Sequence, residues 1–369
     1  MVFYTTVRPV LGDRQMTKHR HPAFPFGWRA LLALLGVLAV MGQAPSARAD
    51  QRVDLYQVAV PVPDRSDASR DAGFRDAMRV VLVRVTGRLG AANDPTYGPL
   101  VASADRYVQQ YRYAIDGRLV VGFDGGAIER WLTGTGAPIW GRTRPVTFVL
   151  LTVPGTGPGT GPGAGTGSGA GSIVTSDTGS DLKSAIDAQA ALRGIELRWP
   201  TAQQLQADGL TDATVLQADP RTLLGDATRA GADALLIGHA SDTSANASVQ
   251  WLFQYQTETS QVAGAAAGVD RAADAYAAIY AVNGAYVPVE VAVDGVRTLA
   301  DYARVQRLFA SMTSVSRAAV LAVHGDSVRW RLLARGGAGP LVRMLALDGS
   351  LQPAAEPGIG GELRYRLRQ

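Results

Sequence analysis

The residues most able to do chemistry are few and scattered. Beyond residue 50 the chain has two histidines, His239 and His324, and each ends an apolar run. A transition-metal site needs several ligands brought together, often with H-x-x-x-H or H-x-H spacing, whereas these histidines lie 85 positions apart. We interpret both as strand-end side chains that reach solvent. The sequence predicts no metal site.

A glycine-rich run imitates two well-known motifs without meeting their requirements. A nucleophilic serine of the α/β-hydrolase kind needs a G-x-S-x-G turn between a strand and a helix. The nearest match is Gly167-Ser168-Gly169, inside a run made almost entirely of Gly, Thr, Pro, Ser and Ala. Glycine recurs there at about every second residue, unlike the fixed spacing before a helix in a dinucleotide fingerprint. We expect neither a catalytic serine nor a bound cofactor.

Paired carboxylates are a stronger candidate, because glycosidases need only two acids at a suitable separation. Asp64 and Asp67 precede a predicted helix, where aspartate oxygens cap the free N–H groups. Asp270 and Asp274 lie one helical turn apart, with Arg271 between them, as on a solvated helix face. We therefore predict no catalytic residue. A glycan hydrolase with paired carboxylates remains the alternative.

An aromatic stretch is a candidate partner surface. On a strand, Tyr107, Gln109, Tyr111 and Tyr113 would share one face. Tyrosine gives a large contact area at low entropic cost, so three of them could form a platform for a ligand or partner. The alternative is that the same face packs beneath a helix, with the hydroxyls at its rim.

A proline-bounded loop offers a second candidate surface. Trp140, Arg142 and Arg144 precede Pro145, and tryptophan and arginine are enriched among the anchors of protein interfaces. The alternative is that Trp140 fills the core of the first domain. These three residues and the tyrosines make up the predicted partner surface.

The elements that would position these residues form a first block, residues 50–154. Alternating apolar residues in 53–62 predict a strand, and 68–86 predict a helix that ends at Gly87. A second helix is expected from Pro95 to Val108. Residues 109–115 and 119–123 flank Asp116-Gly117, which predicts a hairpin. A short helix over 126–132 and a buried strand over 146–153 complete the block.

Three further segments follow. Residues 155–180 bury too little apolar surface to offset their ordering entropy, so we predict a disordered loop. Residues 181–284 alternate helix and strand, which predicts an α/β domain. Residues 285–369 follow the order β-α-β-β-α-β, which is typical of a ferredoxin-like module. The predicted fold class is therefore α+β or α/β, built from small mixed-sheet modules.

The beginning of the chain predicts export. Basic residues precede an apolar run of 12 residues, Ala30–Met41, and Ala47-Arg48-Ala49 follows. This is the pattern of a cleavable signal peptide over residues 1–49, with cleavage between Ala49 and Asp50. The run is short for a membrane-spanning helix, so an uncleaved inner-membrane anchor is the alternative. Met1 and Met16 are both possible starts.

Charge and cysteine content exclude several classes. Residues 1–49 hold six basic residues and one acidic residue, which leaves 30 basic and 31 acidic residues in the rest of the chain. No cationic cluster of the kind that binds nucleic acid is present. The chain has no cysteine, so disulfides, thiolate metal sites and a lipid anchor are excluded. No later segment has 18 consecutive apolar residues, and we expect no membrane span after cleavage.

Five motifs resemble those of the proteobacterial DUF2066 family. They are LYQVAVPV at 55–62, VRVTG at 83–87, YVQQYRY at 107–113, GAPIWGRTRP at 136–145 and GADALLIG at 231–238. The resemblance implies an exported envelope protein and carries over no catalytic residue, because the function of that family is unassigned. The middle region is more loosely similar to periplasmic accessory modules, such as the TolB N-terminal domain and penicillin-binding-protein activators. The glycine-rich insertion after the strand at 146–153 is a departure from that pattern.

Together these features predict a non-catalytic periplasmic binding or adaptor protein in envelope assembly or maintenance. Its partner would be an envelope protein or a cell-wall component. A periplasmic small-molecule binder is a further alternative to the glycan hydrolase.

Overall fold

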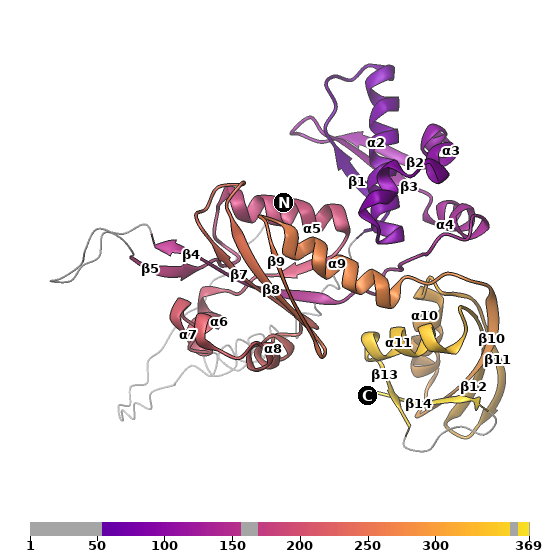
Figure 1. The fold of residues 1–369 in the computed structure, drawn as a ribbon. Helices are drawn as coiled ribbons and strands as arrows, with labels where there is room; N and C mark the ends of the chain where they lie inside the picture. Colours follow the sequence, from indigo (N-terminus) through magenta and orange to yellow (C-terminus); the bar gives the residue numbers. More distant parts are fainter. Residues whose placement is uncertain (1–53, 156–168, 355–360, 369) are drawn as a thin grey trace, which may run out of the picture. The chain divides into compact units, whose positions relative to one another are not determined.

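The structure, a computed structural model, describes residues 54–155, 169–354 and 361–368. Three β-sheets with their helices organise these residues (Figure 1). We call residues 54–145 the first module, 146–282 the middle module and 285–368 the C-terminal module. The predicted α+β class is confirmed. The predicted cleavage site at Ala49 and Asp50 lies outside the described residues.

The first module is an antiparallel sheet with one long helix on its inner face. Its strands lie in the order β1 (Gln57–Val60), β3 (Leu119–Phe123), β2 (Val108–Tyr113). Helix α2 (Asp67–Thr86) begins at Ser66, whose side chain accepts a hydrogen bond from the Ser69 N–H. It ends at Gly87, which has a φ of 72°. Apolar side chains of α2 and the sheet form one buried core.

The segment between α2 and β2 is broken into short turns. It contains 3-10 helices at Leu89–Asn93, Pro95–Tyr97 and Ala104–Tyr107, and α3 (Gly98–Ala102). The continuous helix predicted from Pro95 to Val108 is therefore wrong. Pro99 has no N–H to continue the preceding turn, and it lies in the first turn of α3, which begins at Gly98. Helix α4 (Gly125–Gly134) follows β3, with Asp124 as its N-cap.

The middle module is built on a mixed sheet. The strands lie in the order β5, β4, β7, β8, β9, and β6 also pairs with β4. Their bounds are β4 (Val146–Gly155), β5 (Gly169–Ile173), β6 (Glu196–Arg198), β7 (Ala234–Ala240), β8 (Val249–Tyr255) and β9 (Glu258–Ala263). Strands β4, β6 and β7 are parallel, and the other pairs are antiparallel.

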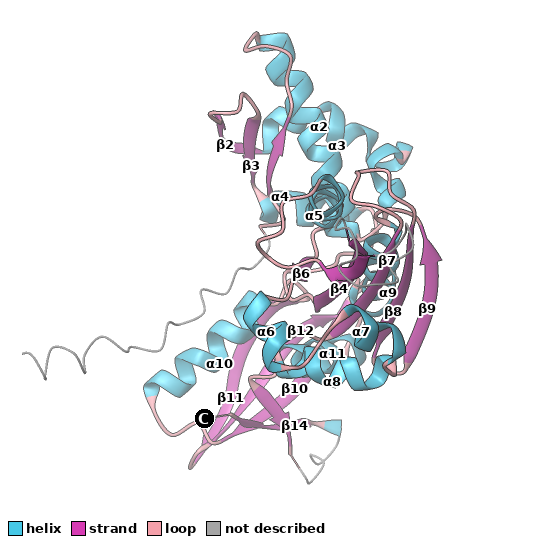
Figure 2. Cartoon of the chain, turned by 90° about the vertical axis from the view of Figure 1, so that its left-hand side faces the viewer, coloured by secondary structure: helices cyan, strands magenta, loops and turns pink. Residues whose placement is uncertain are grey.

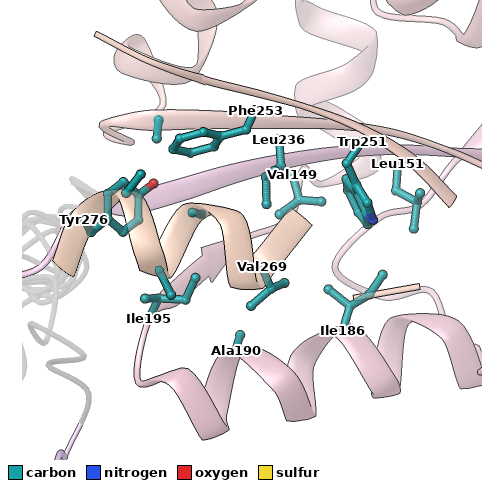
Figure 3. Close-up of a cluster of buried hydrophobic side chains, with 14 of the residues drawn as sticks. Val149, Leu151, Ile186, Ala190, Ile195, Leu236, Trp251, Phe253, Val269 and Tyr276 are labelled. Atoms are coloured by element: carbon teal, nitrogen blue, oxygen red, sulfur yellow. The ribbon is translucent and has the colours of Figure 1, made fainter. Parts of the chain in front are cut away.

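Helices cover both faces of this sheet (Figure 1). On one face, α5 (Asp181–Arg193) and α9 (Ala267–Tyr280) pack against Val149, Leu236 and Trp251 (Figure 3). On the other, α7 (Asp212–Gln217) and α8 (Pro220–Arg229) pack against residues such as Leu150 and Leu235, with α6 (Ala202–Ala207) beside them. Because both faces of the sheet are buried, the sequences of β4 and β7 are almost continuously apolar.

Two expectations about the middle of the chain need correction. The strand at Val146–Gly155 was expected in the first block, but it pairs with β6 and β7 and so lies in the middle sheet. Part of the predicted disordered loop, Gly169–Ile173, forms β5 and pairs with the end of β4. Backbone hydrogen bonds order this strand despite its small side chains. Residues 156–168 of that loop lie outside the described residues.

The C-terminal module extends the predicted order by one strand, β13 (Figure 1), and Figure 2 shows the module's other strands from another side. It contains β10 (Tyr286–Asp294), α10 (Leu299–Ser311), β11 (Val315–His324), β12 (Ser327–Arg335), α11 (Ala338–Asp348), β13 (Leu351–Pro353) and β14 (Leu363–Leu367). The strand order is β11, β12, β10, β14, β13. Strand β13 pairs with β14 in antiparallel fashion, so the chain reverses direction once more before β14. As a result, β14 runs parallel to β10.

Candidate partner-binding groove

The outer face of the first sheet carries a polar groove. Side chains that alternate with the buried core residues, such as Gln57 on β1 and Gln110 on β2, point to this face. The groove encloses about 330 Å³. It is lined by Asp54, Tyr56, Gln57, Gln109, Gln110, Gly122, Phe123, Asp124, Gly125, Gly126 and Arg142, which we call the polar groove. A smaller hollow beside it adds Tyr111, Arg112 and Val120.

Two glycines allow side chains of the polar groove to lie close to the backbone. A Cβ atom on Gly125 would lie 2.6 Å from the ring of Tyr56, and one on Gly122 would lie 3.2 Å from the Gln110 side chain. Both positions therefore bring backbone close to a neighbouring side chain, and at Gly125 no larger residue fits without displacing the ring.

Beneath the groove, the buried Tyr56 pairs with the partly buried Glu129. The Tyr56 hydroxyl donates a hydrogen bond to the Glu129 carboxylate, and the Tyr56 side chain is buried. Burial raises the pKa of Tyr56 well above its ordinary value, and the charge of Glu129 adds to this. Burial also raises the pKa of Glu129, while the Tyr56 hydrogen bond and the charge of Arg142 oppose the rise. The guanidinium of Arg142 lies 5.6 Å from the Tyr56 ring centroid.

The predicted tyrosine face is divided in the structure. Tyr107 ends a 3-10 helix before the strand, and a register shift at Gln109 breaks the expected alternation. Tyr111 and Tyr113 remain together, with ring centroids 6.5 Å apart, opposite the buried residues of β3. Tyr111 packs edge-on against Phe74 of α2 and is 48% exposed. The platform is thus smaller than predicted, and its exposed member is Tyr111.

The residues of the proline-bounded loop that were predicted as interface anchors also lie in different environments. Arg142 is exposed and lines the polar groove. Trp140 is a fully buried core side chain near Tyr276, but it lies in the core of the middle module and not in that of the first domain, as the alternative expected. The guanidinium of Arg144 lies 3.8 Å from the Trp140 ring centroid. Burial lowers the pKa of Arg144 to about 9, so it stays charged at neutral pH.

Three arginines bond the first module to the middle module. Arg84 on α2 donates to the Ala191 carbonyl on α5 at 2.8 Å. Arg193 at the end of α5 donates to the Gly87 carbonyl at 3.0 Å. Arg144 donates to the carbonyls of Arg84 at 2.6 Å and Gly194 at 3.0 Å. We call Arg84, Arg144 and Arg193 the arginine junction.

Sequence reasoning did not identify Arg84 or Arg193. Their acceptors are mostly backbone carbonyls, which every residue carries, so no motif marks them. The one signal is the pair Asp270 and Asp274 on α9. Both carboxylates bind Arg193, the first at 3.1 Å. The two acids therefore neutralise a buried guanidinium, which differs from the solvated helix face expected for them.

The remaining candidates have local partners. The His239 Nδ1 atom lies 2.7 Å from the Thr152 hydroxyl at the ends of two parallel strands. The interpretation of Asp64 and Asp67 as helix caps is wrong, because the N-cap of α2 is Ser66. Asp64 accepts hydrogen bonds from the N–H and hydroxyl of Ser66, and Asp67 pairs with Arg70 at 2.6 Å. Within residues 54–155, 169–354 and 361–368, no three histidine or carboxylate side chains are grouped to hold a metal ion. None of the helices in these ranges combines the length and hydropathy that a membrane crossing requires.

The chain was compared with known protein families, curated proteins and solved structures. A family model described as "Domain of unknown function (DUF8605)" matches residues 49–141, which correspond to the first module. No curated protein has a sequence that matches the chain. Among solved structures, the chain is similar to the LpoB C-terminal domain from Salmonella enterica. The identity is 17%, the match covers 33% of this chain and 82% of that chain, and the TM-score is 0.19.

Proposed function

We propose that this chain is a non-catalytic binding or adaptor protein of the bacterial cell envelope, and that the polar groove binds its partner. The observation that carries the proposal is the groove itself, an open hollow of about 330 Å³ on a sheet face. Arg142 lines it and is exposed. Exposed arginine side chains that line a polar hollow are typical of protein interfaces.

The lining of the groove favours an extended, hydrogen-bonding ligand. Gln57, Gln109 and Gln110 each supply amide donors and acceptors, and Asp54 and Asp124 supply further acceptors. A site for an apolar small molecule would be lined mainly by hydrophobic side chains. We therefore propose a polar segment of an envelope protein as the partner, in preference to a small-molecule ligand.

The cellular setting of this proposal rests on the sequence. The signal-peptide pattern of residues 1–49 and the resemblance to the DUF2066 family both favour export to the periplasm. N-terminal sequencing of the protein from the periplasmic fraction tests this part. A first residue of Asp50 is expected, and a chain that keeps its apolar segment would favour the anchored alternative.

One observation favours a glycan hydrolase as the second candidate. Glu129 has a raised pKa, as a general acid requires, and the nearby groove carries the carboxylates of Asp54 and Asp124. A peptidoglycan-release assay with the purified protein and with Glu129→Gln distinguishes the two. We expect no glycan release from either protein, and release that Glu129→Gln abolishes would replace the adaptor proposal.

In-cell photocrosslinking tests the groove directly. A photoreactive amino acid replaces Gln110 in the groove or, as the matched control, the exposed Gln306 on α10. We expect a discrete adduct with one envelope protein from position 110 and none from 306. The substitution Arg142→Glu, beside the groove, should weaken that adduct without changing the folding of the protein. Equal labelling from both positions would contradict the proposal.

A further inference from the structure

The C-terminal sheet ends in a long edge strand with apolar side chains in solvent. Among the described strands, β11 pairs only with β12 and has no partner on its other side. Val320, Leu321 and Val323 of this strand are exposed, Val323 by 60%. Edge strands with a free row of backbone donors and acceptors are templates for pairing with another chain. Two register shifts leave Arg317–Val320 in uninterrupted pairing with β12.

The register assigns the side chains of β11 to two faces. Val320 lies opposite Trp330 and Val323 opposite Val328, and both partners are buried against the helices. Arg317 lies opposite Leu333, on the other face of the sheet. A strand added at this edge would therefore meet valines on the helix side and an arginine on the outer side.

The outer face of this sheet is rich in arginine. It carries Arg317, Arg329, Arg331, Arg364 and Arg366, which we call the arginine face, with the acids Glu290, Asp294 and Glu362. Three arginines pair with these acids, at 2.8 to 2.9 Å. The arginine side chains remain accessible to solvent in these pairs, as for Arg331, which is 52% exposed. The acids are more buried, as for Glu362, whose side chain is only 13% exposed. Residues 285–369 contain eleven arginines and seven acidic residues, a net charge of +4.

We propose that β11 accepts an acidic, extended segment of a partner protein as an added strand. The backbone of that segment pairs with β11 by β-augmentation. Its alternate side chains are apolar, against Val320 and Val323, and acidic, toward the arginine face beginning at Arg317. This surface lies in a different sheet from the polar groove and goes beyond the function proposed for it.

The charges favour such a partner over a second copy of the chain. A copy that paired through β11 would continue the sheet and place a second arginine face beside the first. Arginine residues brought together in this way repel each other, whereas carboxylates would be attracted. An anionic lipid surface or polymer satisfies the arginines but leaves the backbone edge and the exposed valines unused.

Binding of synthetic peptides tests the proposal. The probe is a labelled ten-residue peptide that alternates valine and glutamate, and the reference alternates valine and lysine. Fluorescence anisotropy with the purified protein should show binding of the first peptide only, weakening as salt is added. Arg317→Glu should weaken that binding at least about tenfold, whereas the control Arg304→Glu, on the exposed side of α10, should leave it unchanged. Equal binding of both peptides, or no effect of Arg317→Glu, overturns the proposal.

Engineered crosslinking locates the bound peptide, because the chain has no cysteine of its own. Val323→Cys, mixed with a cysteine-bearing valine–glutamate peptide and a thiol oxidant, should form a disulfide in much higher yield than Leu299→Cys, an exposed position on α10. Equal yields overturn the proposal. The proposal is also overturned if sedimentation experiments show a dimer whose formation changes in Arg317→Glu. It is overturned as well if the protein binds phosphatidylglycerol vesicles but does not bind the peptide.

Discussion

The guanidinium of Arg193 donates a 3.0 Å hydrogen bond to the carbonyl of Gly87, so α5 of the middle module is bonded to the residue that ends α2. Gly87 has a φ of 72°, and a Cβ atom there would lie 2.4 Å from Ala277 of α9. Helices from both modules therefore meet at one glycine, and the arginine that binds its carbonyl is itself held by α9.

Removing Arg193 should destabilise the protein strongly. Arg193→Ala leaves Asp270 and Asp274 without their cation and the Gly87 carbonyl without its donor. Breaking a buried ion pair from one side costs about 3–5 kcal/mol, and we expect a loss in that range by urea unfolding. Asp274→Asn is the control, since that side chain is 62% exposed, and it should cost less than about 1 kcal/mol. Similar losses for the two variants would argue against the junction.

Trp140 and Tyr111 should respond differently to truncation. Trp140→Ala leaves a cavity in a fully buried site and should cost about 3–5 kcal/mol of unfolding free energy. Tyr111→Ala removes a half-exposed ring and its edge contact with Phe74, worth about 0.5–1.5 kcal/mol. Thermal and urea unfolding measure both losses. If Tyr111→Ala also removes the adduct from position 110 while the protein stays folded, the tyrosine belongs to the partner surface.

The Tyr56–Glu129 pair predicts a pH dependence of stability. Burial raises the pKa of Glu129 from an ordinary value of 4.5. The neutral carboxyl is thus favoured in the folded state, and its contribution is complete below that ordinary value and lost as pH rises through the folded pKa. Relative to Glu129→Gln, the natural protein should lose stability as the pH rises above about 4.5. Parallel pH profiles of unfolding free energy for the two proteins would refute this.

Two glycines of α4 should give opposite results on substitution by alanine. Gly125→Ala places a methyl group against the Tyr56 ring, and overpacking of this kind costs about 1–3 kcal/mol. It should also disturb the hydrogen bond to Glu129 and so flatten the pH dependence. Gly134→Ala is the matched control, because a Cβ atom there meets nothing within 4 Å. It should be neutral or stabilising by up to about 1 kcal/mol.

Periodicity and turn residues were sufficient to predict the long elements. The apolar run before His239 predicted β7, and Gly325-Asp326 predicted the turn between β11 and β12. Strands β5, β9 and β13 were missed, because their residues are small or polar and tertiary pairing determines their conformation.

The candidate site was less predictable. The register shift at Gln109 removed Tyr107 from the tyrosine face, and no residue type announces such a bulge. The groove arises from residues far apart in sequence, such as Gln57, Gln110 and Arg142, that only the folded chain brings together. The spacing of residues predicts which side chains share a face of one helix or strand. It does not predict which side chains from different helices and strands come together.

The arginine junction has a consequence for how this protein can change over evolutionary time. Most of its acceptors are main-chain oxygens, at Arg84, Gly87, Ala191 and Gly194. Because those oxygens are present whatever the side chain, the residues around the junction can diverge while the connection between the modules persists. The three guanidinium groups have no such freedom. Hybrid proteins that join first and middle modules from divergent relatives should therefore remain properly connected wherever these arginines are retained.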